Sequence, residues 1–167
     1  MNMKSALVDV PVLILFFNRP QQLSQVFEQV KKARPSRLFL YQDGARNERD
    51  LPGIEACREI VSQIDWECEV ERLYQEKNFG CDPSEYLSQR WAFSMVDKCI
   101  VLEDDDVPSQ SFFPFCKERI RFLCVSLRTA AYQLASSGTL CQKASLPKES
   151  SGSCVTATMR TLLPGMK

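Results

Sequence analysis

The feature that most constrains the fold is an alternation of short apolar runs with helical patterns along the first 120 residues. Pro11–Phe17 is a continuous apolar run of strand length, which is typical of a strand buried on both faces of a parallel sheet. Apolar side chains then recur with helical spacing at Leu23, Val26, Phe27 and Val30. This pattern predicts a buried strand followed directly by an amphipathic helix.

The same strand and helix pattern recurs three more times before residue 120. Strands are predicted at 37–41, 69–74 and 99–102, of which 69–74 is polar enough to lie near a sheet edge. Between the second and third strands, Ile54, Cys57, Ile60, Val61 and Ile64 form a helical apolar stripe. A third helix is predicted from about Pro83, with Leu87, Trp91 and Met95 in register. A Phe-rich helix is predicted to begin at Pro108 and Ser109. Alternating strands and helices predict an α/β fold, with a mostly parallel sheet, right-handed crossovers and flanking helices.

Charge divides the chain into two parts. Residues 1–120 hold 15 basic and 20 acidic residues, whereas residues 121–167 hold 6 basic residues, one acidic residue (Glu149) and 12 Ser and Thr. We therefore expect one α/β domain over 1–120, incomplete after about residue 120, and an atypical Ser/Thr-rich tail over 121–167. The tail is either a surface-hugging or disordered segment, or a product of truncation or a shifted reading frame.

Composition excludes several classes of function. The chain has no histidine, so Ser-His-Asp and Cys-His catalysis and histidine-ligated zinc are excluded. Its formal net charge is zero and its pI is about 6.3, which argues against a nucleic-acid partner. None of the eight cysteines forms a C-x-x-C pair, and several fall within apolar patterns, which indicates a reducing compartment and a cytoplasmic location.

The apolar N-terminal stretch from Ala6 to Phe17 follows Lys4 and raises the question of a targeting segment. Asp9 and Pro11 interrupt the stretch, no small-residue cleavage site follows it, and it is too short to span a bilayer. We therefore interpret it as a buried strand and expect no transmembrane segment.

Polar residues follow every predicted strand at its carboxyl end. These are Asn18 and Arg19, Asp43 and Gly44, residues 78–80, and the acidic run 103–106. In a sheet of this kind ligands bind outside the carboxyl ends of the strands, where the strand order reverses. The pattern therefore predicts a ligand site at this edge.

The acidic run contains Glu103, Asp104, Asp105 and Asp106. Like charges this close repel one another and raise at least one pKa unless a cation is present, and Mg²⁺ or Mn²⁺ prefers such oxygen ligands. In an extended segment Glu103 and Asp105 would face one side, and Asp104 and Asp106 the other. The alternative is a solvated acidic loop, or a charge cluster near the start of the next helix.

Single residues near this edge have two interpretations each. Asp43 precedes a glycine, so it is either a turn residue or an acceptor for a nucleotide base. Arg19 is either a solvent-facing residue at a helix start or a partner for a phosphate or a base. Ser84 and Ser88 lie one turn apart on the third helix, and we expect them to be exposed polar positions rather than ligands.

Five segments carry a resemblance to a known family. They are Pro-Val-Leu-Ile-Leu-Phe-Phe-Asn-Arg-Pro (11–20), Tyr-Gln-Asp-Gly (41–44), Asn-Phe-Gly-Cys (78–81), Arg-Trp-Ala-Phe (90–93) and Val-Leu-Glu-Asp-Asp-Asp-Val-Pro-Ser-x-Ser-Phe-Phe (101–113). Over residues 10–119 the chain resembles the GT-A nucleotide-diphospho-sugar transferases (glycosyltransferase family 2-like), and most of all bacterial proteins akin to the N-acetylglucosaminyltransferase I branch.

The resemblance implies a GT-A fold, with 1–120 as its nucleotide-sugar-binding half, and a site for a nucleoside-diphosphate sugar. Asp105 would ligate a Mn²⁺ or Mg²⁺ held by the donor diphosphate. Asp104 would contact the ribose or support the metal, and Glu103 would orient the site. Asn18 and Arg19 would bind the base or the phosphates, and Asp43 the edge of the base.

The resemblance implies a sugar transfer to an acceptor that the sequence does not identify. In this family the acceptor site and the catalytic base follow the acidic motif, where this chain has only residues 107–167, so we assign no catalytic base. A truncated product that binds nucleotide only or folds poorly is one alternative function. A sugar-nucleotide pyrophosphorylase is another, although it would need a Gly-rich basic loop where this chain has Asn18-Arg19-Pro20.

Overall fold

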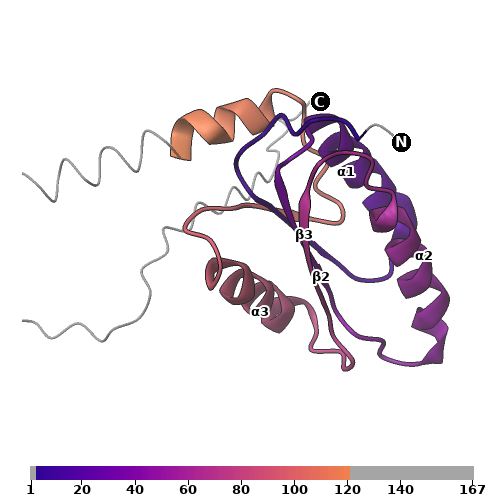
Figure 1. Cartoon of the computed structure of the whole chain (residues 1–167). Coiled ribbons are helices and arrows are strands. Elements are labelled where there is room, and N and C mark those ends of the chain that lie inside the picture. Colours follow the sequence, from indigo (N-terminus) through magenta and orange to yellow (C-terminus); the bar gives the residue numbers. More distant parts are fainter. Residues whose placement is uncertain (1–2, 121–167) are drawn as a thin grey trace, which may run out of the picture.

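A computed structural model describes residues 3–120 as an α/β unit with a four-stranded, all-parallel sheet (Figure 1). The elements are β1 (Val12–Phe16), α1 (Pro20–Ala33), β2 (Arg37–Gln42), the short 3-10 helix η1 (Glu48–Asp50), α2 (Leu51–Ser62), β3 (Glu69–Tyr74), α3 (Cys81–Phe93) and β4 (Ile100–Glu103), and residues 112–120 are helical. The predicted alternation of strands and helices is confirmed. The expected Ser/Thr-rich tail, 121–167, lies outside the described residues.

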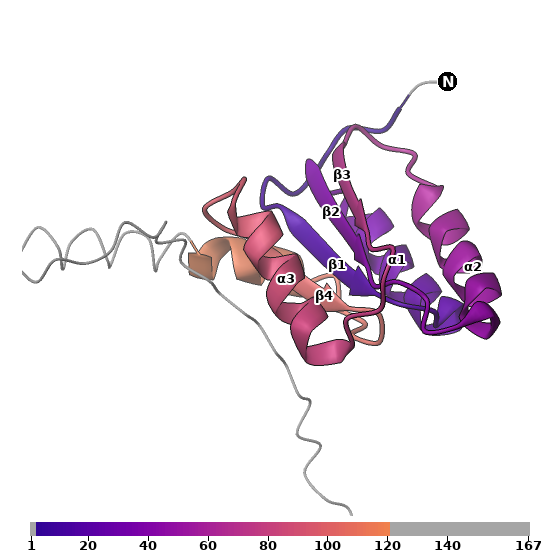
Figure 2. The same cartoon turned by 90° about the horizontal axis from the view of Figure 1, so that it is seen from below.

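The strands lie in the order β3-β2-β1-β4, so the chain steps outward from β1 to β3 and then returns to the other side of β1. Helices α1 and α2, with residues 112–120, pack on one face of the sheet, and α3 packs on the opposite face (Figures 1 and 2). Right-handed crossovers require this division. The connections through α1 and α2 move along the sheet from β1 toward β3, whereas the connection through α3 moves in the opposite direction, from β3 to β4. The strand order therefore reverses between β1 and β4.

The central strand β1 is buried along its whole length, as its continuous apolar sequence predicts. Its alternate side chains enter two cores: Ile14 packs into the core beneath α1 and α2, and Leu13 packs into the core beneath α3. Leu23 and Val26 of the predicted α1 stripe are fully buried in the first of these cores. Trp66 completes that core and donates a hydrogen bond from Nε1 to the Pro35 carbonyl oxygen at 2.8 Å.

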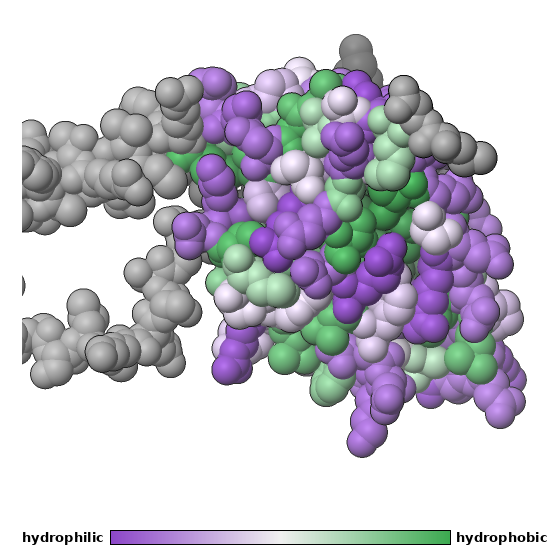
Figure 3. Space-filling model, in the orientation of Figure 1, coloured by the Kyte–Doolittle hydropathy of each residue, from purple (hydrophilic) through white to green (hydrophobic). Residues whose placement is uncertain are grey.

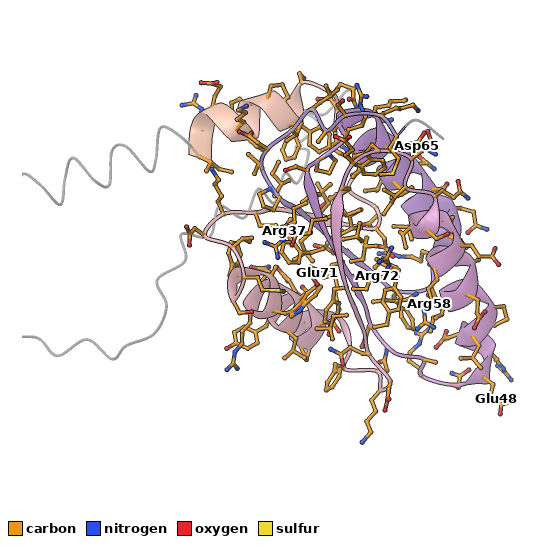
Figure 4. The ribbon with its side chains drawn as sticks, viewed as in Figure 1. Arg37, Glu48, Arg58, Asp65, Glu71 and Arg72 are labelled. Carbon is orange, nitrogen blue, oxygen red and sulfur yellow. The ribbon has the colours of Figure 1, made fainter. Side chains whose placement is uncertain are left out.

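Strand β3 forms one edge of the sheet, which confirms the prediction from its polar sequence. Figure 3 shows polar side chains beside smaller apolar patches on the face of the molecule that carries β3. On the α3 side, Glu71 lies against Arg37 of β2 at 3.5 Å, and on the α2 side Arg72 lies near Arg58 (Figure 4). Charged side chains on an edge strand oppose pairing with another chain.

The third helix differs from its prediction in bounds and in its buried face. It begins at Cys81 rather than near Pro83, and it ends at Phe93, so Met95 lies beyond it. The fully buried positions of α3 are Ser84, Ser88 and Ala92 rather than the larger side chains of the predicted stripe; Leu87 and Trp91 pack at its flanks. These three residues are spaced by four, so they form a stripe of small side chains that allows α3 to lie close to the sheet.

The expectation that Ser84 and Ser88 are exposed is therefore wrong, because this close packing buries both.

Among residues 3–120, no helix combines the length and the apolar content needed to cross a membrane.

Candidate functional site

A cavity of about 350 Å³ lies at the carboxyl edge of the sheet, where the strand order reverses. The segments at or after the carboxyl ends of all four strands contribute to its wall, which is lined by Leu15, Phe16, Phe17, Asn18, Arg19, Asp43, Arg46, Asn78, Gly80, Cys81, Ser84, Glu103 and Asp104. Five of the six site residues named from the sequence are in this wall, and the sixth, Asp105, contacts Arg19 from beside it. The topology brings them together because the carboxyl ends of parallel strands meet at one edge.

Arg19 joins the end of β1 to the acidic run after β4. It stands at the N-cap of α1, donating from Nε and Nη2 to the two carboxylate oxygens of Asp104 and from Nη1 to Asp105 Oδ2 at 3.0 Å. The backbone N–H of Phe17 also approaches Asp104 Oδ2, at 3.4 Å. Such paired hydrogen bonds between a guanidinium and a carboxylate are strong and directional, so Arg19 fixes the geometry of the acidic run.

The expected alternation of side chains along the acidic run is wrong. β4 ends at Glu103, and the chain turns through Asp104 and Asp105, with the Asp106 N–H donating to the Glu103 carbonyl oxygen at 3.2 Å. Because the segment turns, Asp104 and Asp105 both reach Arg19. Their difference lies in burial: the side chain of Asp104 is 3% exposed and that of Asp105 is 51% exposed.

The acidic run keeps an excess of negative charge despite Arg19. Burial, together with repulsion from Asp106 and Asp105, raises the pKa of Glu103. Burial also raises the pKa of Asp104, and hydrogen bonds from Arg19 only partly oppose this. Reciprocally, the hydrogen bond to Asp104 raises the pKa of Arg19. A positively charged ligand group or cation at this edge would lower the repulsion.

Asp43 follows β2 and holds the loop between β3 and α3. Its Oδ1 accepts hydrogen bonds from the Gly44 N–H and the Phe79 N–H, both at 2.9 Å, and its Oδ2 accepts from Asn78 Nδ2 at 2.8 Å and the Gly80 N–H at 3.0 Å. A carboxylate offers about four acceptor positions, so protein donors fill those of Asp43. A nucleotide base would bind this carboxylate only by replacing one of them.

The backbone of Gly44 approaches that same loop closely. A Cβ atom at Gly44 would lie 2.5 Å from the carbonyl carbon and 2.6 Å from the carbonyl oxygen of Lys77. We expect Gly44→Ala to destabilise the domain by about 2 kcal/mol, measured by urea unfolding, because the loop backbone must shift. Gly80→Ala is the comparison: Gly80 has φ +85° but open space around it, so strain alone should cost about 1 kcal/mol. Equal losses would contradict the steric argument.

Arg46 and Asp50 belong to the site but were not found from the sequence. Asp50 is buried and accepts from Arg46 Nε and Nη2 at 2.9 and 2.8 Å and from Asn18 Nδ2 at 2.6 Å. The Arg46 guanidinium also stacks over the Phe17 ring, 5.0 Å from its centroid. The hydrogen bond from Arg46 lowers the pKa of Asp50 to about 2. The available signal was the i, i+4 spacing of the two residues just before α2, within a stretch that we interpreted only as polar.

The acidic run offers the oxygen ligands that a hard cation prefers, although Arg19 occupies both carboxylate oxygens of Asp104 and one of Asp105. Within residues 3–120, no three His, Cys, Asp or Glu side chains gather as a metal site. Asp105 contacts Arg19 through Oδ2 only, and its side chain is half-exposed, whereas that of Asp104 is buried. Mg²⁺ commonly takes one or two carboxylates and completes its shell with phosphate and water, so the residues present fit an ion that arrives with a phosphorylated ligand.

Comparison of the chain with known protein families, curated proteins and solved structures finds no match. What the cavity can bind therefore has to be inferred from its side chains and their geometry.

Proposed function

We propose that the cavity binds a nucleoside-diphosphate sugar together with Mn²⁺ or Mg²⁺, and that residues 1–120 are the donor-binding half of a metal-dependent glycosyltransferase with a GT-A fold. The observation that carries the proposal is that Arg19, in the wall of a cavity at the point where strand order reverses, contacts both Asp104 and Asp105. Open parallel sheets bind nucleotides at such points. A cavity of about 350 Å³ lies within the usual range for small-molecule sites.

The charges around the cavity support a requirement for a cation. Two arginines, Arg19 and Arg46, face three carboxylates, Asp43, Glu103 and Asp104, in the cavity wall. A diphosphate alone would add negative charge to a wall that already has an excess of it, which is unfavourable. A divalent ion held by Asp105 and the diphosphate would offset that repulsion, and it would supply Lewis-acid stabilisation of the departing nucleoside diphosphate.

The protein's own side chains have separate parts in this proposal. Arg19 holds Asp104 and presents Asp105, while Glu103 lies at the end of β4 in the cavity wall. Asn18 and Arg46 also line the cavity, and both donate hydrogen bonds to Asp50, which anchors them. Asp43 acts by ordering the loop that contributes Asn78 and Gly80 to the cavity wall. The acceptor and the catalytic base are outside this proposal.

Removal of the Asp105 carboxylate tests the proposal. We expect Asp105→Ala to weaken Mn²⁺-dependent binding of a nucleoside diphosphate by at least tenfold, because the ion loses its protein ligand. The measurement is isothermal titration calorimetry of the full chain with UDP, GDP, ADP and CDP, with Mn²⁺ and with a chelator.

The matched control is Asp97→Ala, which removes an exposed aspartate before the amino end of β4 and should leave binding unchanged. Binding that is equally tight with the chelator, or unchanged in Asp105→Ala, would count against the cation site. A transfer or hydrolysis assay with the nucleotide sugar then separates a transferase from a chain that only binds nucleotide.

A further inference from the structure

Ser84 is a buried hydroxyl in the cavity wall that has no hydrogen-bond partner. The residue belongs to the cavity wall and is 3% exposed, and its Oγ contacts no donor or acceptor among the described residues. Ser88, one turn later on α3, differs because its Oγ donates to the Glu85 carbonyl oxygen at 2.9 Å. A buried polar group without a partner lowers stability, so Ser84 needs an explanation that Ser88 does not.

The surroundings of Ser84 add further hydrogen-bonding capacity. It lies in the first turn of α3, whose N-cap is Gly80, and no side chain caps this helix. The first N–H groups of a helix have no partner within the helix. The N–H of Gly80 itself is used by Asp43. The unpartnered hydroxyl and the uncapped helix start therefore lie in the same part of the cavity wall.

The charges near this part of the wall indicate what kind of group fits there. The Cys81 thiol lies at the start of α3, and its pKa is raised by burial and by the negative charges of Glu103, Asp82 and Glu85, which the positive charge of Arg19 only partly offsets. A phosphate would meet the same repulsion. The cationic side chains of the cavity, Arg19 and Arg46, come instead from the segments after β1 and β2.

We propose that Ser84 is a ligand-binding residue whose hydroxyl, beside the uncapped start of α3, binds an uncharged hydroxyl or carbonyl group of the ligand, while the phosphates lie toward the arginine side of the cavity. This inference rests on the proposed function, because it orients a nucleoside-diphosphate sugar within that site. The uncharged group belongs either to the nucleoside or to the sugar.

The proposal gives Ser84→Ala opposite effects on stability and on binding. Without ligand, the variant should melt about 2 °C higher or more, because it loses an unsatisfied buried hydroxyl and gains a stronger helix former. With ligand, its affinity should fall about tenfold, because the hydrogen bond to the ligand is lost. A hydroxyl with a purely structural role would not produce this combination.

Tyr41→Phe is the matched control. Tyr41 is also fully buried with an unpartnered hydroxyl, but it packs in the core beneath α3 and does not line the cavity. Its replacement should leave affinity unchanged and should not lower the melting temperature. Ser88→Ala is the second control on the same helix, and it should also leave affinity unchanged.

The experiment uses the full chain with Mn²⁺ and two series of probes: uridine, UDP and UDP-N-acetylglucosamine, and guanosine, GDP and GDP-mannose. A tenfold loss that is already present with the nucleoside diphosphate assigns the uncharged group to the nucleoside. A loss seen only with the nucleotide sugar assigns it to the sugar. Tight binding by the unaltered chain with equal affinity in Ser84→Ala overturns the role of Ser84 alone. No binding by the unaltered chain in any arm overturns the proposed function, and this inference with it.

Discussion

Replacement of Arg19 by methionine is expected to destabilise the domain by about 3 kcal/mol. The substitution keeps an apolar stem but removes the guanidinium that binds both oxygens of Asp104, which is buried. The Arg19 side chain is 46% exposed, but its removal leaves the buried charge of Asp104 without compensation, and such losses are large. The remaining contact of the Asp104 carboxylate, a 3.4 Å approach from the Phe17 N–H, is too long to replace two charged hydrogen bonds.

The pH dependence of this loss follows from the pKa of Asp104. Burial already raises it above the ordinary value of 3.8, and without Arg19 it should rise further. A carboxyl group with a raised pKa in the folded state favours folding at low pH, and that contribution is lost as pH rises through the folded-state pKa. The deficit of Arg19→Met should therefore be small near pH 4 and grow toward pH 7.

Urea unfolding of the variant at several pH values measures both effects. The double variant Arg19→Met/Asp104→Asn removes the uncompensated charge, so it should recover part of the stability and lose the added pH dependence. A deficit that stays constant between pH 4 and pH 7, or a double variant less stable than the single one, would show that Asp104 is not the residue through which Arg19 acts.

The positions of the strands along the chain were predictable, because each strand has a strong local signal. The run at 11–17 is apolar without interruption, and in the structure β1 is buried on both faces between β2 and β4. The polar run at 69–74 likewise predicted an edge strand. The position of the site followed as well, because in a parallel sheet the residues after the strands meet at one edge, whatever the strand order.

The contacts inside the site were not predictable, because they depend on turns and on tertiary packing. The acidic run was treated as extended, but a turn after Glu103 brings Asp104 and Asp105 to one arginine. Ser84 was expected to be exposed because its side chain is polar, but the close approach of α3 to the sheet buries it. The two hydrogen bonds from Arg46 to Asp50 form in a polar segment whose sequence has neither a helical nor a strand periodicity of apolar residues.

Replacement of Asp43 by asparagine is expected to cost about 3 kcal/mol and to loosen the loop before α3. The carboxylate accepts hydrogen bonds from Asn78 Nδ2 and from the N–H groups of Phe79 and Gly80, at distances of 2.8 to 3.0 Å. Hydrogen bonds to a charged acceptor contribute about 1.5 to 3 kcal/mol each. Asparagine has the same size but turns an NH₂ group toward these donors, so at least one of them is left without an acceptor.

Hydrogen exchange distinguishes this role from a general loss of stability. In Asp43→Asn the amide protons of Phe79 and Gly80 should exchange much faster, whereas those of the central strand β1 should keep their protection under conditions where the variant stays folded, because local opening of the loop does not require opening of the core. Asn78→Ala removes one donor to Asp43, together with the hydrogen bond from Asn78 Nδ2 to the Gly44 carbonyl oxygen at 2.8 Å. It leaves the acceptors of the Phe79 and Gly80 N–H groups in place, so it should cost about 2 kcal/mol with a smaller change in exchange. If the two amides in Asp43→Asn stayed as protected as in the unaltered chain, the loop would be held by something other than this carboxylate. The cavity wall at Gly80 and Ser84 would then not depend on Asp43 for its shape.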